Sequence, residues 1–305
     1  MSRYPKLMVL GALLAAGILG FFLESGMNPY YLQILIYIGI NLILAMSLNL
    51  INGFTGQFSL GHAGFMSIGA YVMAYVTTQV IPSTWLSPPV FWCVLLLSGA
   101  AAAVAGLLIG LPSLRLRGDY LAIVTLGFGE IVRVVIQNMT VLGGPRGYTA
   151  IPKLTHFGDV FAVAILCVSG LFFLMRSTYG KGFLAVRDDE LAAEAMGVST
   201  TRYKVTAFVL SSFFAGIAGG LYAGYITYIT PGQFGFMKSI EIVVMVIVGG
   251  MGSIPGVVLS SVLLTALPEF LRVSEYRMIL YALCLIALMM LRPQGLFAGI
   301  GKRLR

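Results

Sequence analysis

The sequence NGFTGQFSLGHAGFMSIGAY, residues 52–71, lies between two strongly apolar runs and decides what kind of fold the chain adopts. It has glycines at positions 53, 56, 61, 64 and 69, which loosen a helix. Its polar side chains are those of Asn52, Thr55, Gln57, Ser59, His62 and Ser67. Such a segment does not suit a helix that faces lipid. It suits a glycine-broken segment that is enclosed by protein or lines a cavity.

The composition of the whole chain identifies the surroundings of this stretch. The 305 residues are 59% hydrophobic and 10% charged, with a mean hydropathy of +0.95, whereas a soluble domain is ~45–50% apolar and ~25% charged. Between Leu7 and Leu114 the only charged side chain is that of Glu24. A water-soluble surface needs far more charge than this, so the chain is predicted to be a membrane protein.

Ten apolar segments are long enough to cross a membrane or to enter it halfway. They lie at about residues 7–23, 30–51, 53–80, 90–111, 118–138, 159–175, 205–228, 239–252, 254–271 and 276–292. We therefore expect an all-α polytopic membrane protein with about 8–10 transmembrane segments, some of them glycine-broken, forming one domain over residues 1–305. We expect residues 7–23 to be retained as the first span, because no A-x-A cleavage site follows them.

The basic residues predict the orientation. With the N-terminus inside and alternating sides, 13 of the 19 Lys and Arg residues lie in the cytoplasm and five outside. The positive-inside rule favours this arrangement over its mirror image, so both termini are expected to be cytoplasmic. Since the basic residues fall in short loops, nucleic acid is not an expected partner, whereas membrane lipids are. No metal, cofactor or catalytic arrangement is recognisable, and no GxxxxGK(S/T) phosphate loop occurs.

Three carboxylates in or beside apolar segments each have a basic residue three positions away, on the same helix face. These pairs are Glu130 with Arg133, Lys238 with Glu241, and Glu269 with Arg272. We interpret them as structural intramembrane ion pairs rather than as functional sites. Paired carboxylates are not free to bind a coupling ion, which argues mildly against an ion-coupled carrier.

The loop at residues 176–204 holds nine of the thirty charged residues and is expected to be cytoplasmic. Within it, DDELAAEAMG predicts a short helix that Asp188 or Asp189 caps and Gly197 ends. Its apolar face is formed by Leu191, Ala192, Ala195 and Met196. Periodicity alone leaves open whether this face folds back on the protein or contacts a cytoplasmic partner.

The chain resembles the larger permease subunit of the branched-chain amino acid ABC importers. The resemblance rests on GQFSLGHAGFMSIGAY (56–71), RGDYLAIVTLGFGEIVR (117–133), STYGKGFLAVRDDELAAEAMGVSTTRYKVTAF (177–208), AGIAGGLYAGYITYITPGQF (215–234), VVMVIVGGMGSIPG (243–256) and RPQGL (292–296). It implies a bacterial inner-membrane subunit that works with a second permease, two cytoplasmic ATP-binding subunits and an extracytoplasmic substrate-binding protein. The 176–204 loop then couples to the ATPase through Glu190, Ala192, Glu194, Ala195 and Gly197. Arg146 and Tyr148 depart from the neutral Asn and Leu expected in the outer loop.

A permease needs a path, and two glycine-rich segments are the candidates. We predict a translocation path formed by Asn52, Gln57, Ser59, Gly61, His62, Gly249, Gly250 and Ser253. A path without a ring of unpaired charge suits a small neutral or zwitterionic solute, such as a branched-chain or other small amino acid. His62 has a second interpretation, a hydrogen bond to a neighbouring helix.

The residues leave three alternatives open: an ion-coupled secondary carrier, an ABC permease for urea or short amides, and a membrane scaffold or enzyme. The strings at 55–68 and 230–240 also resemble one another, either by chance or as an inverted-topology repeat.

Overall fold

The computed structural model describes residues 26–82, 85, 87–113 and 118–270, and the single positions 17, 283, 286, 290 and 295. The expected spans at 7–23 and 276–292 lie almost entirely outside these residues, as do both termini and Arg272.

The described residues are predominantly helical, and six of the helices are long and apolar enough to cross a membrane. The helices are α2 (Pro29–Asn49), α3 (His62–Tyr75), α4 (Pro88–Ser113), α5 (Asp119–Asn138), α6 (Phe157–Arg176), α7 (Thr178–Asp188), α8 (Glu190–Ala195), α9 (Thr200–Ile226), α10 (Phe236–Gly249) and α11 (Ile254–Phe270). Short π or 3₁₀ turns are η1 (Leu50–Phe54), η2 (Val76–Val80), η4 (Thr140–Leu142), η5 (Gly144–Arg146) and η6 (Pro231–Phe234). The expectation of an all-α polytopic membrane protein is confirmed.

One expected span, residues 53–80, is divided in the structure. Its first residues extend α2 as the π-helical turn η1, and residues 55–61 are not helical. The helix α3 then begins at His62 and is only 14 residues long. Gly56, at φ +69°, adopts a left-handed conformation that glycine accepts without steric cost, and the α-helix is interrupted here.

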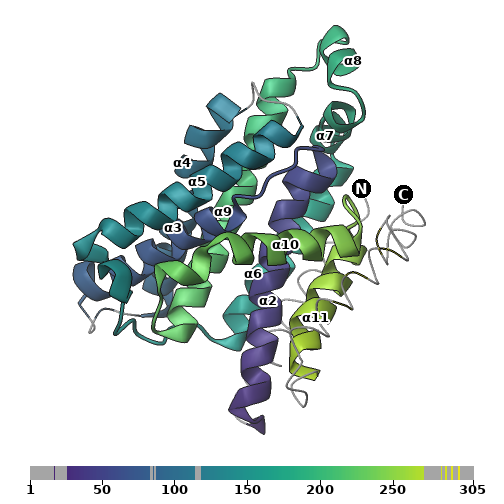
Figure 1. Ribbon diagram of the computed structural model, residues 1–305. Coiled ribbons are helices and arrows are strands. Elements are labelled where there is room, and N and C mark those ends of the chain that lie inside the picture. The colour runs from purple at the N-terminus through teal and green to yellow at the C-terminus, as the bar shows by residue number, and fades with distance from the viewer. Residues whose placement is uncertain are drawn as a thin grey trace.

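Close helix contacts hold the bundle together. The helix α9 packs along α3 and α4, and a Cβ atom on Gly69 would lie 2.0 Å from the carbonyl oxygen of Gly216. Only glycine permits the backbones of α3 and α9 to approach this closely. The C-terminal part of α2 is buried among α6, α9, α10 and α11 (Figure 1).

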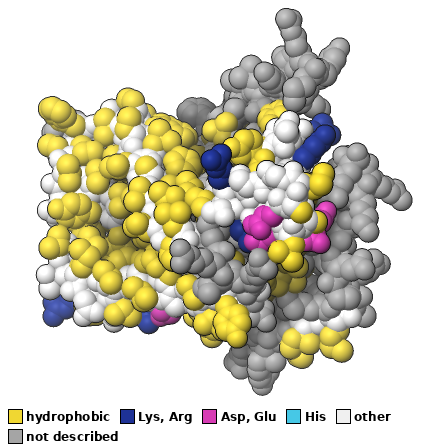
Figure 2. Space-filling view, turned by 90° about the horizontal axis from the view of Figure 1, so that it is seen from above, with side chains coloured by type: hydrophobic (Ala, Val, Ile, Leu, Met, Phe, Trp, Pro, Cys, Tyr) yellow, Lys and Arg dark blue, Asp and Glu magenta, His cyan; other side chains and the backbone are white. Residues whose placement is uncertain are grey.

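Different segments of the chain lie at the two ends of the bundle. The helices α7 and α8 project at one end, and the loop between α5 and α6 lies at the other (Figure 1). The 20-residue helix α6 joins the two ends and is about 30 Å long. Figure 2, which looks onto the α8 end, shows a group of acidic side chains right of centre and a separate one at the lower left, whereas apolar side chains cover much of the side that holds α3, α4 and α5.

Candidate translocation and coupling sites

The end of α2 and the loop after α10 form a tight contact, which we call the glycine joint and define as residues 49–53 and 249–253. Oδ1 of Asn49 accepts a hydrogen bond of 2.8 Å from the N–H of Gly252. A Cβ atom on Gly53 would lie 2.2 Å from the same nitrogen. The positive φ angles of Gly250 (+92°) and Gly252 (+79°) turn the chain into this contact. The structure thus places side by side the two glycine-rich segments that the sequence singled out, with Ser253 buried at the second.

The polar side chains after the joint are buried inside the chain. Asn52 and Ser59 hold the loop closed, because Oδ1 of Asn52 accepts from the N–H of Ser59 at 3.1 Å and Nδ2 of Asn52 donates to the Ser59 carbonyl at 3.3 Å. His62 begins α3, and its Nε2 lies in hydrogen-bond contact with Oγ of Ser47 on α2, at 2.8 Å. The expected interhelical hydrogen bond of His62 is therefore present. A Cβ atom on Gly61 would lie 2.2 Å from the Thr125 carbonyl oxygen, so this loop also packs tightly on α5.

Several polar atoms here lack a hydrogen-bond partner. Six buried side-chain atoms of the described residues make no hydrogen bond within the chain, and four of them lie in the joint or the loop and helix start after it: Asn49 Nδ2, Gln57 Oε1, Ser59 Oγ and His62 Nδ1. The other two are Tyr71 Oη and Thr155 Oγ1. A buried polar atom left unpaired costs about 1–3 kcal/mol. The clustering of the first four marks the joint and the loop after it as a place suited to contact with water or a polar solute.

The first turns of α3 and α10 also meet. The N–H of Ala63 donates to Oγ of Ser239 at 3.2 Å. The similar strings at 55–68 and 230–240 each lead into one of these two helices.

The helix α8 forms as the sequence predicts. Oδ1 of Asp189 accepts from the N–H groups of Leu191 and Ala192, at 2.9 and 3.0 Å. Gly197 follows at φ +84°, which is the left-handed conformation of a helix C-cap. Local residue chemistry therefore determines both ends of this short helix.

The two glutamates of α8 tie it to α9. Oε1 of Glu190 lies 2.6 Å from Nζ of Lys204, whose side chain is only 6% exposed. Oε1 of Glu194 accepts a 2.6 Å hydrogen bond from the hydroxyl of Thr200. Sequence reasoning missed both partners, because these contacts depend on how the loop folds back onto α9.

The apolar side of α8 faces away from the rest of the chain. Leu191 is 63% exposed and Met196 is 84% exposed, and Ala192 and Ala195 are exposed beside them. Only Ala193 is buried. The acidic groups thus fasten the helix to the chain, and its apolar face is left uncovered.

Arg187 at the end of α7 connects this region with the glycine joint. Its Nη1 donates to the carbonyl oxygen of Gly53 at 3.4 Å, and its Nη2 lies 2.9 Å from Oδ1 of Asp188. Its Cγ atom would lie 2.8 Å from a Cβ atom on Gly56, so its stem covers that glycine. This contact joins residues 134 positions apart, and no local sequence pattern predicts it.

Two of the three expected ion pairs are present. Glu130 and Arg133 lie 2.7 Å apart, and Lys238 and Glu241 lie 3.0 Å apart. Glu130 also accepts from the N–H of Phe236 at 3.1 Å, which links α5 to the start of α10. In the third expected pair, Arg272 lies outside the described residues, and Glu269 accepts a hydrogen bond from the hydroxyl of Tyr30.

An apolar helical bundle with a buried, polar, glycine-broken segment is typical of membrane transport proteins. Comparison with known proteins then gives the family. Residues 30–291 match the family described as "Branched-chain amino acid transport system / permease component", and the chain belongs to it.

Individual relatives agree with this assignment. The chain is 38% identical to the high-affinity branched-chain amino acid transport system permease protein LivM of Salmonella typhimurium strain LT2, over 95% of this chain and 74% of the relative. It is 37% identical to LivM of Escherichia coli K12 with the same coverage. The probable LivM of Methanocaldococcus jannaschii is 26% identical over 82% of this chain and 84% of its own length. No solved structure matches the chain. The protein is thus a transport subunit with several membrane-spanning helices in the inner membrane.

Proposed function

We propose that the chain is one of two membrane-spanning permease subunits of an ABC importer that moves branched-chain or other small amino acids inward, energised by separate ATPase subunits. The names of the relatives support the solute class. The observation that carries the mechanism is the uncovered apolar face of α8 at the end of the bundle. We assign this end to the cytoplasm, in accord with the positive-inside rule.

In this proposal an ATP-binding subunit covers Leu191, Ala192, Ala195 and Met196. Burying this face removes apolar surface from water, and that provides the driving force for docking. Because Glu190 and Glu194 fix α8 to α9, the docked helix moves with the body of the permease. Arg187 then carries the movement to Gly53 in the glycine joint. Glu190, Glu194 and Gly197 act in coupling by holding and ending the helix.

We place the translocation path along the glycine joint and the loop after it. Asn52, Gln57, Ser59, Gly61 and His62 provide one side of the path, and Gly249, Gly250 and Ser253 provide the other. The unpaired polar atoms of Gln57, Ser59 and His62 support this assignment, because they suit contact with water or solute. The joint is closed in this structure, and transport requires it to open.

The exposed side of α5 is the proposed contact with the second permease. Glu130 and Arg133 are 36% and 31% exposed in the middle of a membrane helix, where charge facing lipid is costly. Ile123, Gly127 and Ile131 form an exposed stripe beside them, and Gly127 leaves space for a close helix contact. A second membrane subunit that covers this side of α5 would shield the pair from lipid.

An ion-coupled carrier is the main alternative of another class. Glu130 and Glu241 are each ion-paired, which disfavours them as ion-binding groups. An ABC permease for urea or short amides remains a variant of the same mechanism with another solute.

Purification of the tagged chain from its native membrane in mild detergent tests the assembly. We expect two ATP-binding subunits and a second permease to accompany it. The variant Ala195→Arg should lose the ATP-binding subunits and keep the second permease. Recovery of the unmodified chain as a homo-oligomer alone would contradict the proposal.

A further inference from the structure

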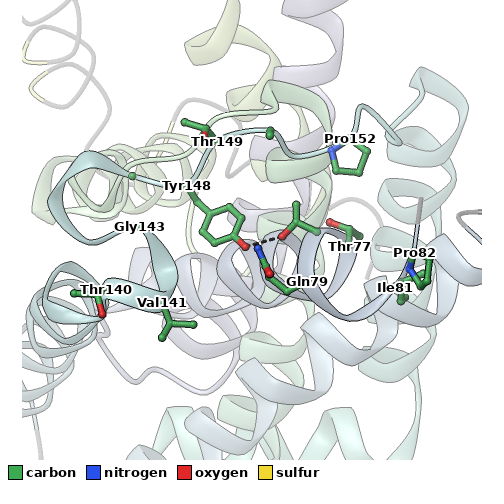
Figure 3. A pocket seen from close by; sticks show the side chains of 13 residues that line it. Thr77, Gln79, Ile81, Pro82, Thr140, Val141, Gly143, Tyr148, Thr149 and Pro152 are labelled. Carbon is green, nitrogen blue, oxygen red and sulfur yellow. Dashed lines mark hydrogen bonds between the residues drawn. The ribbon is translucent and has the colours of Figure 1, made fainter. Parts of the chain in front are cut away.

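A cavity of about 660 Å³ opens at the end of the bundle opposite α8. It lies between the end of α3 with its turn η2 and the loop that joins α5 to α6 (Figure 3). Its polar side chains are those of Thr77, Thr78, Gln79, Thr140, Tyr148 and Thr149. The remaining lining is aliphatic, proline or glycine, and among the described residues that line it none carries a charge.

The backbone around Tyr148 is firmly held. Tyr148 forms an antiparallel bridge with Ile229, with N–H to carbonyl distances of 2.8 and 3.1 Å. Its phenol oxygen lies 2.6 Å from the hydroxyl oxygen of Thr78. Ala150, which also lines the cavity, is held at φ +60°, a conformation that non-glycine residues rarely adopt. Backbone strain of this kind persists only where the surroundings enforce it, and it clusters at functional sites.

The chemistry of the lining selects a class of ligand. Hydroxyl and amide groups both donate and accept, so they can bind a carboxylate and an ammonium group of one molecule. Aliphatic side chains such as those of Ile81 and Val141 can contact an apolar substituent. A solute with net charge would enter without a counter-charge, which is unfavourable. The volume lies within the range of about 300–1,000 Å³ that is typical of small-molecule sites.

We infer that this cavity is an entry site that binds the transported solute, a zwitterionic amino acid with an aliphatic side chain, before the glycine joint opens. Tyr148, held by Thr78, shapes its wall, and Val141 limits the space for the side chain of the solute. The inference rests on the proposed function and adds to it a selective contact made by the permease itself.

The test measures ATP-dependent uptake of leucine and valine by the complete complex in proteoliposomes, with binding protein loaded to saturation. Val141 is 63% exposed, so Val141→Phe narrows the cavity without entering the core. We expect the leucine-to-valine ratio of kcat/KM to fall at least threefold. Val104→Phe is the matched control, because Val104 is an exposed valine of α4 that does not line the cavity, and the leucine-to-valine ratio of kcat/KM should not change in this variant.

A second variant tests the hydrogen bond. Tyr148→Phe removes only the phenol oxygen and should lower kcat/KM severalfold for both leucine and valine. Of the two variants, only Val141→Phe should change the leucine-to-valine ratio of kcat/KM. If Val141→Phe leaves the leucine-to-valine ratio of kcat/KM unchanged, the entry site is overturned, whether uptake of both solutes is normal or falls equally. An equal fall would indicate that the cavity is a docking surface for the binding protein. Absence of ATP-dependent uptake by the unmodified complex would instead overturn the proposed function.

Discussion

Asn49 and Gly252, 203 residues apart in sequence, are joined by a hydrogen bond of 2.8 Å from the Gly252 N–H to Oδ1 of Asn49. The bond closes the glycine joint, in which the π-helical end of α2 meets the loop after α10. Gly53 lies directly against this bond, because its missing Cβ atom would be 2.1 Å from Oδ1 of Asn49.

We predict that Gly53→Ala forces the joint apart. The added methyl group meets backbone and a hydrogen-bonded oxygen, so we expect a destabilisation of about 1–3 kcal/mol and loss of transport. Thermal unfolding of the detergent-purified complex and uptake measure the two effects. Gly170→Ala on α6 is the control, because nothing lies within 4 Å of its Cβ position and its stability and uptake should stay normal. Normal uptake by Gly53→Ala would show that transport does not require the close contact of Gly53 with Asn49 and Gly252.

Cysteine labelling tests the path itself. In a background that lacks Cys93, Cys167 and Cys284, Ser59→Cys should react with a small water-soluble thiol reagent, and faster during ATP turnover. Ser98→Cys is the matched control, because Ser98 is equally buried but its hydroxyl donates to the Val94 carbonyl within α4. Protection of Cys at position 59 in the resting complex and during turnover would remove the path assignment.

The Glu130–Arg133 pair is predicted to be structural. Neutralising one partner leaves the other charge unpaired inside the membrane, so Glu130→Gln or Arg133→Met alone should destabilise assembly by about 2–3 kcal/mol. The double variant should regain much of the assembled complex, as measured by size-exclusion chromatography. Normal assembly without transport in the double variant would mean that the pair acts in transport.

Coupling should depend on the apolar face of α8 and on its C-cap. Ala195→Arg places a guanidinium group in the docking contact at a cost of several kcal/mol, and Gly197→Val strains the left-handed cap by about 1 kcal/mol or more. Both variants should insert and pair with the second permease, but lose ATPase stimulation by loaded binding protein. Thr201→Arg, at an exposed position of α9, should keep it. An unchanged transport rate in Ala195→Arg would exclude α8 as the coupling element.

Features that local residue chemistry determines were predictable from the sequence. The all-α membrane class follows from composition, and the ends of α8 follow from Asp189 and Gly197. The pairs Glu130 with Arg133 and Lys238 with Glu241 follow from their spacing on one helix. The two glycine-rich segments, around residues 52–62 and 249–253, were predicted to form one path because both interrupt apolar helices. The structure places them in contact.

Features that depend on the folded chain were not predictable. The break in the expected span at 53–80 lies where glycines occur both before and after it, so composition does not show which of them interrupts the helix. The contacts of Arg187 with Gly53 and of Tyr148 with Thr78 join residues distant in sequence. The periodicity of α8 could not show that its glutamates face Lys204 and Thr200, since that orientation is set by tertiary packing.

In the proposed function, ATP hydrolysis by docked subunits, rather than an ion gradient, drives solute through this chain. The test is uptake of radiolabelled leucine into proteoliposomes that hold the complete complex. ATP is present or absent on the side of the membrane that carries the ATP-binding subunits, and proton and sodium gradients are either imposed or collapsed. We predict uptake that requires hydrolysable ATP and loaded binding protein and persists when ionophores remove both gradients. Uptake driven by an imposed gradient in the absence of ATP would instead identify the chain as an ion-coupled carrier.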